Sequence, residues 1–504
     1  MKKKITILVI IFLIFGASTA ILAQNNTLSP MEELGKEIYF DKISSPDKMA
    51  CADCHSPKVG FTGPKAGINM HGAAYRGAVA QRFGNRKPPS AAYATQSPVF
   101  HYDEVEGLFI GGNFWDGRAT GELLGSPAAE QAQGPFLNPL EHNNASMADV
   151  LEQIANSKYA WMWENVWGEP ISIETDEDIA ANYDRLGLTI AEYEASFEVN
   201  QFSSKYDYYL LGDVDLTEQE AWGLELFNDP DKGNCAACHP SELGPAPDYK
   251  PPLFTDYSFD NLGAPKNPKN PFYDMDEVYI NGEPINPLGD EWIDYGLGGF
   301  LETHPDPDWQ AMAGENMGKF KVPTLRNVDK RTGNGFPKAY LHNGVFKSLK
   351  DVVHFYNTRD DGITMWPDPE VTENINTLEM GDLELSDEEE DAIVAFMTTL
   401  SDGYDLKKSP PFTNTNILTE PELEIGPNPF VSTTNISFSL PQSNKVELYV
   451  YDLSGRKVKT LINEWLGQGN NMVIMDSKGL ENGIYLVALR IGDQVKTKKV
   501  TLTR

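Results

Sequence analysis

The runs Cys51-Ala-Asp-Cys54-His55 and Cys235-Ala-Ala-Cys238-His239 share the pattern C-x-x-C-H and contain all four cysteines of the 504-residue chain. In this pattern the two thiols bind the vinyl groups of a haem c and the adjacent histidine binds its iron. The alternatives for a C-x-x-C pair are half of a zinc site or a thioredoxin-like redox pair. Zinc leaves the adjacent histidine unexplained, and neither flank has the βαβ context of a redox pair. The two runs therefore predict two covalently bound haem c groups.

The N-terminus indicates an exported protein, and the net charge excludes some classes of partner. Residues 1–23 have the form of a signal peptide, with three lysines, an apolar run too short to span a membrane, and small residues near Ala20 and Ala23. No cysteine follows, which argues against a lipoprotein. The formal net charge of −33 argues against nucleic acid or an anionic membrane surface as a partner. We expect export to the periplasm and then to the cell surface or beyond, without a membrane span.

The pattern along the chain predicts a mainly α fold, in which two cytochrome c-like haem domains precede a small C-terminal β-sandwich. Each C-x-x-C-H run lies among short helical patterns and loops rich in proline and glycine. A capping box at Thr217-Glu-Gln-Glu220 predicts a helix before the second run, and residues 387–400 predict a closing helix. Period-2 alternation replaces the helical pattern near the C-terminus. The expected boundaries are a haem domain at 28–205, a second at 206–405, a linker at 406–424 and the sandwich at 425–504.

The C-terminal segment resembles the type A sorting domain of the type IX secretion system of Bacteroidetes. The resemblance rests on Pro427-Asn-Pro-Phe430, Val450-Tyr-Asp-Leu-Ser-Gly455 and Asn482-Gly-Ile-Tyr485. It implies that the secretion machinery carries the protein across the outer membrane and that the tail is cleaved afterwards. An ordinary binding sandwich is the alternative.

Residues 30–405 resemble the bacterial dihaem cytochrome c peroxidases and the related MauG proteins. The matching segments are Leu34-Gly-Lys36, Tyr39-Phe-Asp41, Phe114-Trp-Asp-Gly-Arg118, Glu130-Gln-Ala-Gln-Gly-Pro135, Phe254-Thr-Asp256, Lys321-Val-Pro-Thr-Leu-Arg-Asn327 and His342-Asn-Gly344. The resemblance implies reduction of hydrogen peroxide with electrons from a small cytochrome c or another one-electron donor protein, and a homodimer as a common state. A MauG-like oxidase of a protein substrate and a pure electron-transfer cytochrome are the alternatives.

The resemblance also implies roles around the first haem, bound by Cys51, Cys54 and His55. Gln131 and Glu141 are ten positions apart, as are the distal glutamine and glutamate of the family. Glutamate there exchanges protons with peroxide, and glutamine orients it. An exposed loop acid is the alternative for Glu141.

Two further positions of the first half follow from the same resemblance. Trp115 corresponds to the tryptophan between the haems, although residues 121–127 lengthen the segment that follows it. His71 stands sixteen residues after His55, the position of a removable sixth iron ligand, and an exposed loop histidine is its alternative.

The second haem, bound by Cys235, Cys238 and His239, departs from the peroxidases at its implied sixth ligand. Tyr356 stands where the peroxidases have methionine and where MauG has tyrosine. Methionine raises a haem potential, whereas a phenolate favours ferric or higher states, so Tyr356 favours the MauG-like alternative. His354, Met312 and Met317 are competing ligands outside the register.

The family also holds a calcium ion between its haem domains, bound by an asparagine in a segment like Arg-Asn-x-Pro-Ser. This chain reads Arg86-Lys-Pro-Pro-Ser90 and has Lys87 at that position. A cation does not bind calcium, so Asn85 or backbone carbonyls would have to replace that ligand. Ca²⁺ remains an implied cofactor without a placed site.

Overall fold

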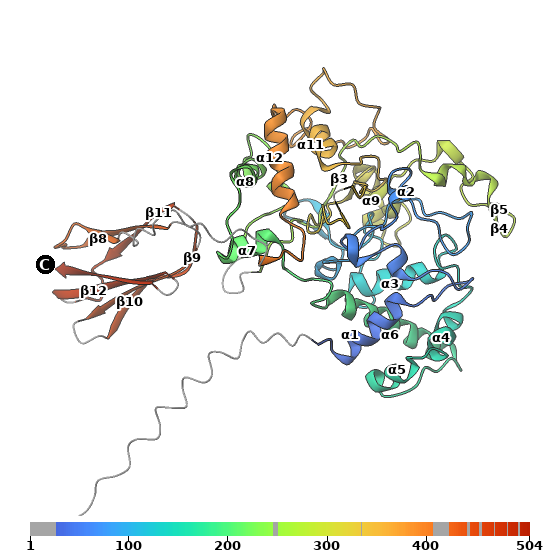
Figure 1. Cartoon of the computed structure of the whole chain (residues 1–504), viewed down its shortest axis with the longest axis horizontal. Coiled ribbons are helices and arrows are strands. Elements are labelled where there is room, and N and C mark those ends of the chain that lie inside the picture. The colour runs from blue at the N-terminus through green and yellow to red at the C-terminus, as the bar shows by residue number, and fades with distance from the viewer. Residues whose placement is uncertain are drawn as a thin grey trace, which may run out of the picture.

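A computed structural model describes residues 27–244, 250–333, 335–406, 423–440, 444–452, 456–467, 469–480, 482–491 and 494–503. The expected signal peptide, most of the expected linker, and the expected turns at 453–455 and 492–493 lie outside these residues. We call residues 27–205 the first half and residues 206–406 the second half. In Figure 1 the two halves form one body, and the C-terminal strands form a separate group.

The first half is built around helices that bury one apolar cluster. Its core includes Trp163 (0% exposed), Leu186 and Ile190. Ser29 and Glu32 form a capping box at the start of the first helix. The elements are α1 (Pro30–Phe40), η1 (Cys51–Asp53), η2 (Pro57–Val59), α2 (Ala66–Asn69), η3 (Ala94–Gln96), β1 (His101–Asp103), β2 (Leu108–Ile110), α3 (Pro127–Leu137), α4 (Met147–Ala155), α5 (Ala160–Trp167) and α6 (Asp176–Ala195).

The second half has its own apolar cluster, which includes Phe227, Phe355 and Phe396. The predicted capping box is confirmed, since the Thr217 side chain accepts a hydrogen bond from the Glu220 backbone N–H. The predicted closing helix exists but ends at Thr398. The elements are α7 (Lys205–Leu211), α8 (Glu218–Asn228), η4 (Cys235–Ala237), β3 (Phe259–Asp260), η5 (Pro271–Glu277), β4 (Tyr279–Ile280), β5 (Glu283–Pro284), η6 (Gly289–Glu291), α9 (Gly296–Leu301), α10 (Pro307–Ala311), η7 (Ala313–Asn316), β6 (Phe320–Lys321), α11 (Leu349–Thr358) and α12 (Asp387–Thr398).

Each half has a helix crossing that only glycine permits. A Cβ atom on Gly35 of α1 would lie 2.2 Å from the Thr189 carbonyl oxygen of α6. A Cβ atom on Gly223 of α8 would lie 1.8 Å from the Ala392 carbonyl oxygen of α12. In both halves the helix that carries the glycine precedes the C-x-x-C-H run, which agrees with a loose duplication.

We expect Gly223→Val to lower the free energy of unfolding by about 1–3 kcal/mol or more, because the added side chain forces α8 and α12 apart. Chemical denaturation of the haem-loaded protein measures this change. Gly314→Val is the matched control, since a Cβ atom on Gly314 meets nothing within 4 Å. Equal effects of the two substitutions would show that the crossing is not close-packed.

The C-terminal segment forms two antiparallel sheets, of strand order β10-β9-β12-β13 and β11-β8-β7. The predicted alternation is confirmed, because the side chains at positions 436, 438, 440, 446, 448, 450, 485, 487 and 489 are all buried. Residues of both sheets share one apolar cluster, and the β-sandwich remains our prediction. The strands are β7 (Leu423–Gly426), β8 (Thr433–Leu440), β9 (Asn444–Asp452), β10 (Lys457–Leu466), β11 (Gly469–Asp476), β12 (Gly483–Ile491) and β13 (Gln494–Leu502).

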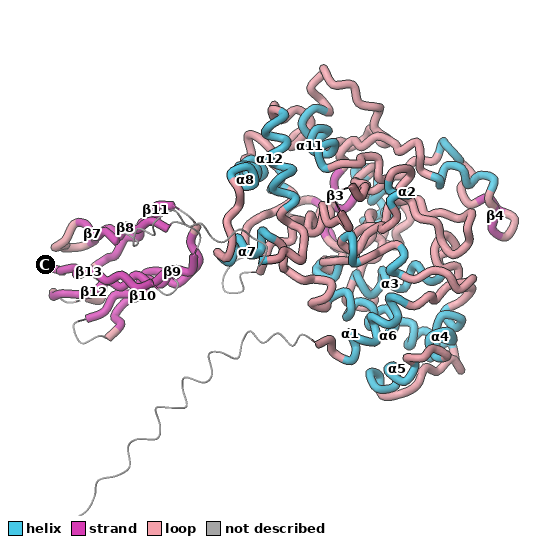
Figure 2. The backbone as a smooth tube through the Cα atoms, in the orientation of Figure 1, coloured by secondary structure: helices cyan, strands magenta, loops and turns pink. Residues whose placement is uncertain are grey.

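The mainly α expectation needs qualification. Helices supply most of the regular structure of the two halves, but loops supply more of their length than helices do (Figure 2). The division into two cytochrome c-like domains remains a prediction. Within the described ranges, no helix combines the length and the apolar character needed to cross a bilayer.

Candidate functional site

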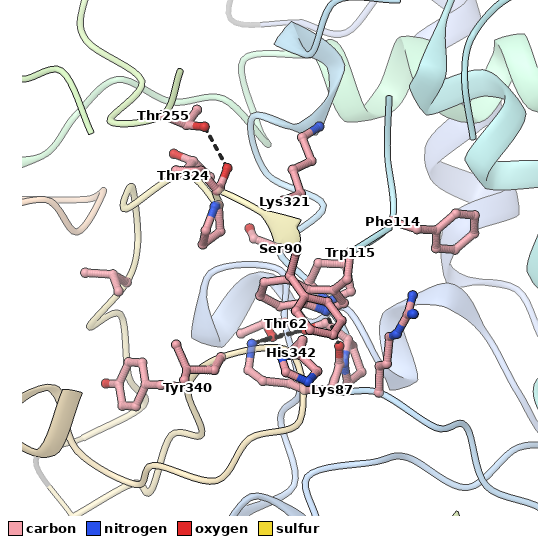
Figure 3. Close-up of a pocket in the computed structure, with 18 of the residues that line it drawn as sticks. Thr62, Lys87, Ser90, Phe114, Trp115, Thr255, Lys321, Thr324, Tyr340 and His342 are labelled. Carbon is pink, nitrogen blue, oxygen red and sulfur yellow. Dashed lines mark hydrogen bonds between the residues drawn. The ribbon is translucent and has the colours of Figure 1, made fainter. Parts of the chain in front are cut away.

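A cavity of about 410 Å³ lies between the two halves and is lined by both C-x-x-C-H runs. Its walls include Cys51, Cys54 and His55 from the first half and Cys238 and His239 from the second. The lining is mostly apolar, with a small set of charged and polar side chains. Figure 3 shows part of this lining, where Trp115, His342 and Lys87 lie close together.

Both motif histidines are held so that one ring nitrogen remains for a metal. His55 Nδ1 lies 3.0 Å from the Pro89 carbonyl oxygen and 3.3 Å from that of Phe61. His239 Nδ1 lies 2.7 Å from the Phe254 carbonyl oxygen. A carbonyl accepts a proton only from a protonated Nδ1, which leaves Nε2 as the free lone pair. Burial lowers the pKa of both imidazoles, to about 4 for His55, so both rings are neutral at pH 7.

The four cysteines form no disulfide with one another, and all four are half-buried. Burial raises the pKa of each, to about 12 for Cys54, Cys235 and Cys238. A redox pair depends on a lowered thiol pKa, so these environments argue against that alternative. Within the described residues, no group of three or more His, Cys, Asp or Glu side chains lies close enough to hold a metal, which argues against zinc.

The side chains of each C-x-x-C-H motif fit one haem c group, so the two motifs together fit two. Each run offers two thiols and one neutral imidazole with an available Nε2, on the wall of a large and mostly apolar cavity. The chemistry of the donors therefore supports two haem c groups in this cavity.

Glu141 and Gln131 both line the cavity, and Glu141 is close enough to the first motif to add to the effect of burial in raising the pKa values of the Cys51 and Cys54 thiols. Gln131 belongs to α3, and Glu141 lies in the turn that follows this helix, where Asn138 Nδ2 donates a 2.8 Å hydrogen bond to Glu141 Oε1. Burial raises the pKa of Glu141, while Arg118 and the Asn138 hydrogen bond lower it in part. The exposed-loop alternative for Glu141 does not agree with this position.

Trp115 also lines the cavity and is 8% exposed. Its indole Nε1 donates to the Lys87 carbonyl oxygen at 2.8 Å, and its ring centroid lies 6.5 Å from that of His342. The side chain thus touches residues of both halves. The extra residues 121–127 form a loop in which Glu130 accepts hydrogen bonds from the backbone N–H groups of Gly121, Leu123 and Leu124.

Tyr356 lies on α11 and lines the cavity near the second motif. Burial raises the pKa of its phenol well above the ordinary value, and Cys238 adds to the shift. The competing ligands lie elsewhere: His354 Nδ1 contacts Glu390 Oε1 at 2.9 Å, while Met312 and Met317 pack against a different apolar cluster. None of these three residues lines the cavity.

His71 is not brought to the first motif. It lies in an exposed loop, does not line the cavity, and places Nδ1 2.7 Å from the Gly67 carbonyl oxygen. In this structure the position of His71 therefore agrees with the alternative of an exposed loop histidine, despite its spacing of sixteen residues from His55.

Sequence reasoning missed several titratable residues of the cavity. Lys321 and Lys338 line it, and so does Glu194, whose pKa is raised by burial to about 8; Lys87 also lines it but was considered only as a departure from the calcium ligand. The lysine at position 87, where the family has asparagine, was the only available signal. Glu194 resembles an ordinary helix acid in the sequence.

The residues at the implied calcium position do not fit a calcium ion. Lys87 Nζ lies 3.2 Å from both Thr62 Oγ1 and the Pro88 carbonyl oxygen. These are oxygen atoms of the kind that calcium binds, but an ammonium group donates to them here.

The chain is similar to known dihaem proteins over most of its length. Residues 29–215 match the family model for di-haem cytochrome c peroxidase, and residues 424–503 match that for the secretion system C-terminal sorting domain. The methylamine utilization protein MauG of Paracoccus denitrificans is 31% identical over 385 residues, which cover 73% of this chain and 88% of that protein. The cytochrome-c peroxidase IdrP2 of Denitromonas iodatirespirans is 27% identical over 376 residues, with coverage of 74% and 81%.

A solved structure agrees with these similarities. The diheme peroxidase BthA from Burkholderia thailandensis matches with a TM-score of 0.60 and 28% identity, over 75% of this chain and 87% of that one. The resemblance of residues 30–405 and that of the C-terminal segment are both confirmed.

Proposed function

We propose that this chain is an exported peroxidase that reduces hydrogen peroxide to water. The chain belongs to the family of di-haem cytochrome c peroxidases and MauG proteins. The electrons come from a small cytochrome c or another one-electron donor protein. The observation that carries this proposal is the position of Glu141 on the cavity wall near the first motif, with Gln131 lining the same cavity. An electron carrier has no need of a distal acid there.

The chain's own residues supply the proton chemistry of this reaction. A haem held by Cys51, Cys54 and His55 would supply the coordination of peroxide and the electrons that reduce it. Glu141 takes a proton from one peroxide oxygen and gives it to the other, which leaves as water. Gln131 orients peroxide by hydrogen bonding. In total, one peroxide, two electrons and two protons yield two molecules of water.

Trp115 is the proposed link between the two haems. Its indole lies between Lys87 of the first half and His342 of the second. An aromatic side chain at this junction shortens the distance that an electron has to tunnel from the second site to the first.

Steady-state turnover tests the proposal. We expect the haem-loaded protein to oxidise reduced cytochrome c in proportion to added peroxide, with two cytochromes consumed for each peroxide. Absence of turnover with small one-electron donors as well as with cytochrome c, after prior reduction of the protein, would reject it.

The rate of peroxide reduction should fall at low pH, since Glu141 accepts a proton only when it is ionised. Burial raises its pKa, so we expect the acid limb of the pH–rate profile above the ordinary carboxyl value of about 4.3. Asn138→Ala removes the hydrogen bond that lowers this pKa and should move the limb to higher pH. An unchanged limb in Asn138→Ala would contradict the assignment of the limb to Glu141.

A MauG-like oxidase is the second candidate function, and the position of Tyr356 near Cys238 favours it. In that case two haems held by the two motifs would supply storage for two oxidising equivalents taken from peroxide, and a protein side chain would supply the electrons. A high-valent spectrum that persists for minutes after peroxide is added without a donor would favour this function.

The sorting domain at residues 424–503 supports the proposed route of export. A signal peptide at 1–23 brings the chain to the periplasm, where haem c is attached. The secretion machinery then carries it to the cell surface or outside.

A further inference from the structure

Three lysines of the second half donate hydrogen bonds to uncharged oxygen atoms of the first half. Lys338 Nζ lies 3.1 Å from the Val59 carbonyl oxygen, and Lys347 Nζ lies 2.8 Å and 2.7 Å from those of Asn69 and His71. Both ammonium groups also bond to carbonyl oxygens of their own half. Lys321 Nζ bonds to Ser97 Oγ, to the Gly112 carbonyl oxygen and to Asn113 Oδ1.

Lys87 of the first half connects the two halves through its backbone, while its ammonium group bonds to oxygen atoms of the first half. Its backbone N–H donates to the His342 carbonyl oxygen at 2.8 Å, and its carbonyl oxygen accepts from Trp115 Nε1. Its ammonium group contacts Thr62 Oγ1 and lies 5.9 Å from the centre of the Trp115 ring. Figure 3 shows these side chains gathered at one point of the cavity wall.

The charge of these four lysines is not balanced by ion pairs. Among the described residues, no carboxylate lies within 4 Å of any of the four ammonium groups, although the chain has 74 acidic residues. Burial lowers their pKa values, to about 8 for Lys87 and Lys347 and about 7 for Lys321 and Lys338. The junction thus combines lysine amino groups that have no carboxylate partner with carbonyl, hydroxyl and amide oxygens.

Such oxygen atoms are the ligands that a hard divalent cation takes in proteins. A lysine ammonium is a compact point charge with three donors, so it satisfies the same oxygen atoms without a bound ion. When protonated, such an amino group also repels a divalent cation that approaches the same oxygen atoms. We propose that the Lys87 ammonium group takes the place of a bound divalent cation, and that the ammonium groups of Lys321, Lys338 and Lys347 hold the two halves together without calcium.

Calcium analysis of the haem-loaded full chain tests the proposal. We expect less than about one tenth of an equivalent of calcium after gel filtration without added metal. We also expect the same thermal midpoint in EDTA as in millimolar calcium chloride. About one retained equivalent of calcium, together with a lower midpoint in EDTA, would overturn the proposal.

Lys87→Asn tests the position itself, because it replaces the ammonium group with an oxygen ligand. In EDTA we expect the midpoint of the haem-loaded variant to fall by roughly 2–4 °C, and added calcium to restore it. Lys36→Asn is the matched control, since Lys36 forms a half-exposed ion pair with Glu198 and should not respond to calcium. A Lys87→Asn midpoint that is independent of calcium, or equal to that of wild type in EDTA, would contradict the exchange of ammonium for metal. Neither measurement depends on peroxide turnover, so the proposal stands or falls separately from the proposed function.

Discussion

We expect Glu141→Gln to lower the rate of peroxide turnover by a factor on the order of 10²–10⁴, the usual contribution of a general acid–base group. The substitution keeps the shape of the side chain and the possibility of a contact with Asn138, but removes the site that accepts a proton. Stopped-flow mixing of the reduced, haem-loaded variant with peroxide measures the effect directly. The visible spectrum before mixing should match that of wild type.

Glu192→Gln is the matched control, because Glu192 is exposed on α6 in the same half. It should leave the rate unchanged. If the rate of peroxide reduction by Glu141→Gln were within a factor of about two of the wild-type rate, Glu141 would have no catalytic role.

We expect Tyr356→Met to raise the reduction potential of the second haem by on the order of 0.1 V or more, within the range of about 0.8 V over which axial ligands set haem potentials. Burial holds the Tyr356 phenol in its neutral form, so a phenolate forms only beside a positive charge such as ferric iron. A phenolate stabilises ferric iron, and a thioether does not. Redox titration monitored by visible spectroscopy gives the two potentials.

Tyr279→Phe is the control for this measurement, since Tyr279 is 59% exposed and belongs to the short strand β4. It should change neither potential. An unchanged potential of the second haem in Tyr356→Met would mean that residue 356 does not bind its iron. A raised potential of the second haem should also shorten the lifetime of any high-valent state. Because only the MauG-like function needs a long-lived state of this kind, this lifetime distinguishes it from the peroxidase.

The parts of the site that the sequence predicted are those fixed over a short stretch of chain. A C-x-x-C-H run determines its own turn, whereas the carbonyl oxygens of Pro89 and Phe254 that orient His55 and His239 come from loops further along the chain and were not predicted. Gln131 and Glu141 are joined by α3 and one turn, so their separation in sequence carries over to space. The strand alternation of the tail is local in the same sense.

What the sequence did not predict depends on contacts between distant segments. The spacing of His71 from His55 implied an iron ligand. In the structure His71 lies in an exposed loop, where its Nδ1 contacts the Gly67 carbonyl oxygen. Lys338 meets Val59 across 279 positions, and no periodicity carries such a pairing. The burial of these lysines follows from how the two halves pack, which a pattern of residue types does not contain.

Electron paramagnetic resonance and resonance Raman spectroscopy of the oxidised, haem-loaded protein identify the iron ligands and so test the proposed site most directly. We predict two unequal haems. The first should be high-spin, with His55 as its only protein ligand and an open position facing Glu141 and Gln131. The second should be bound by His239 and the Tyr356 phenolate. Two low-spin haems, each with both axial positions filled by histidine or methionine, would contradict this prediction.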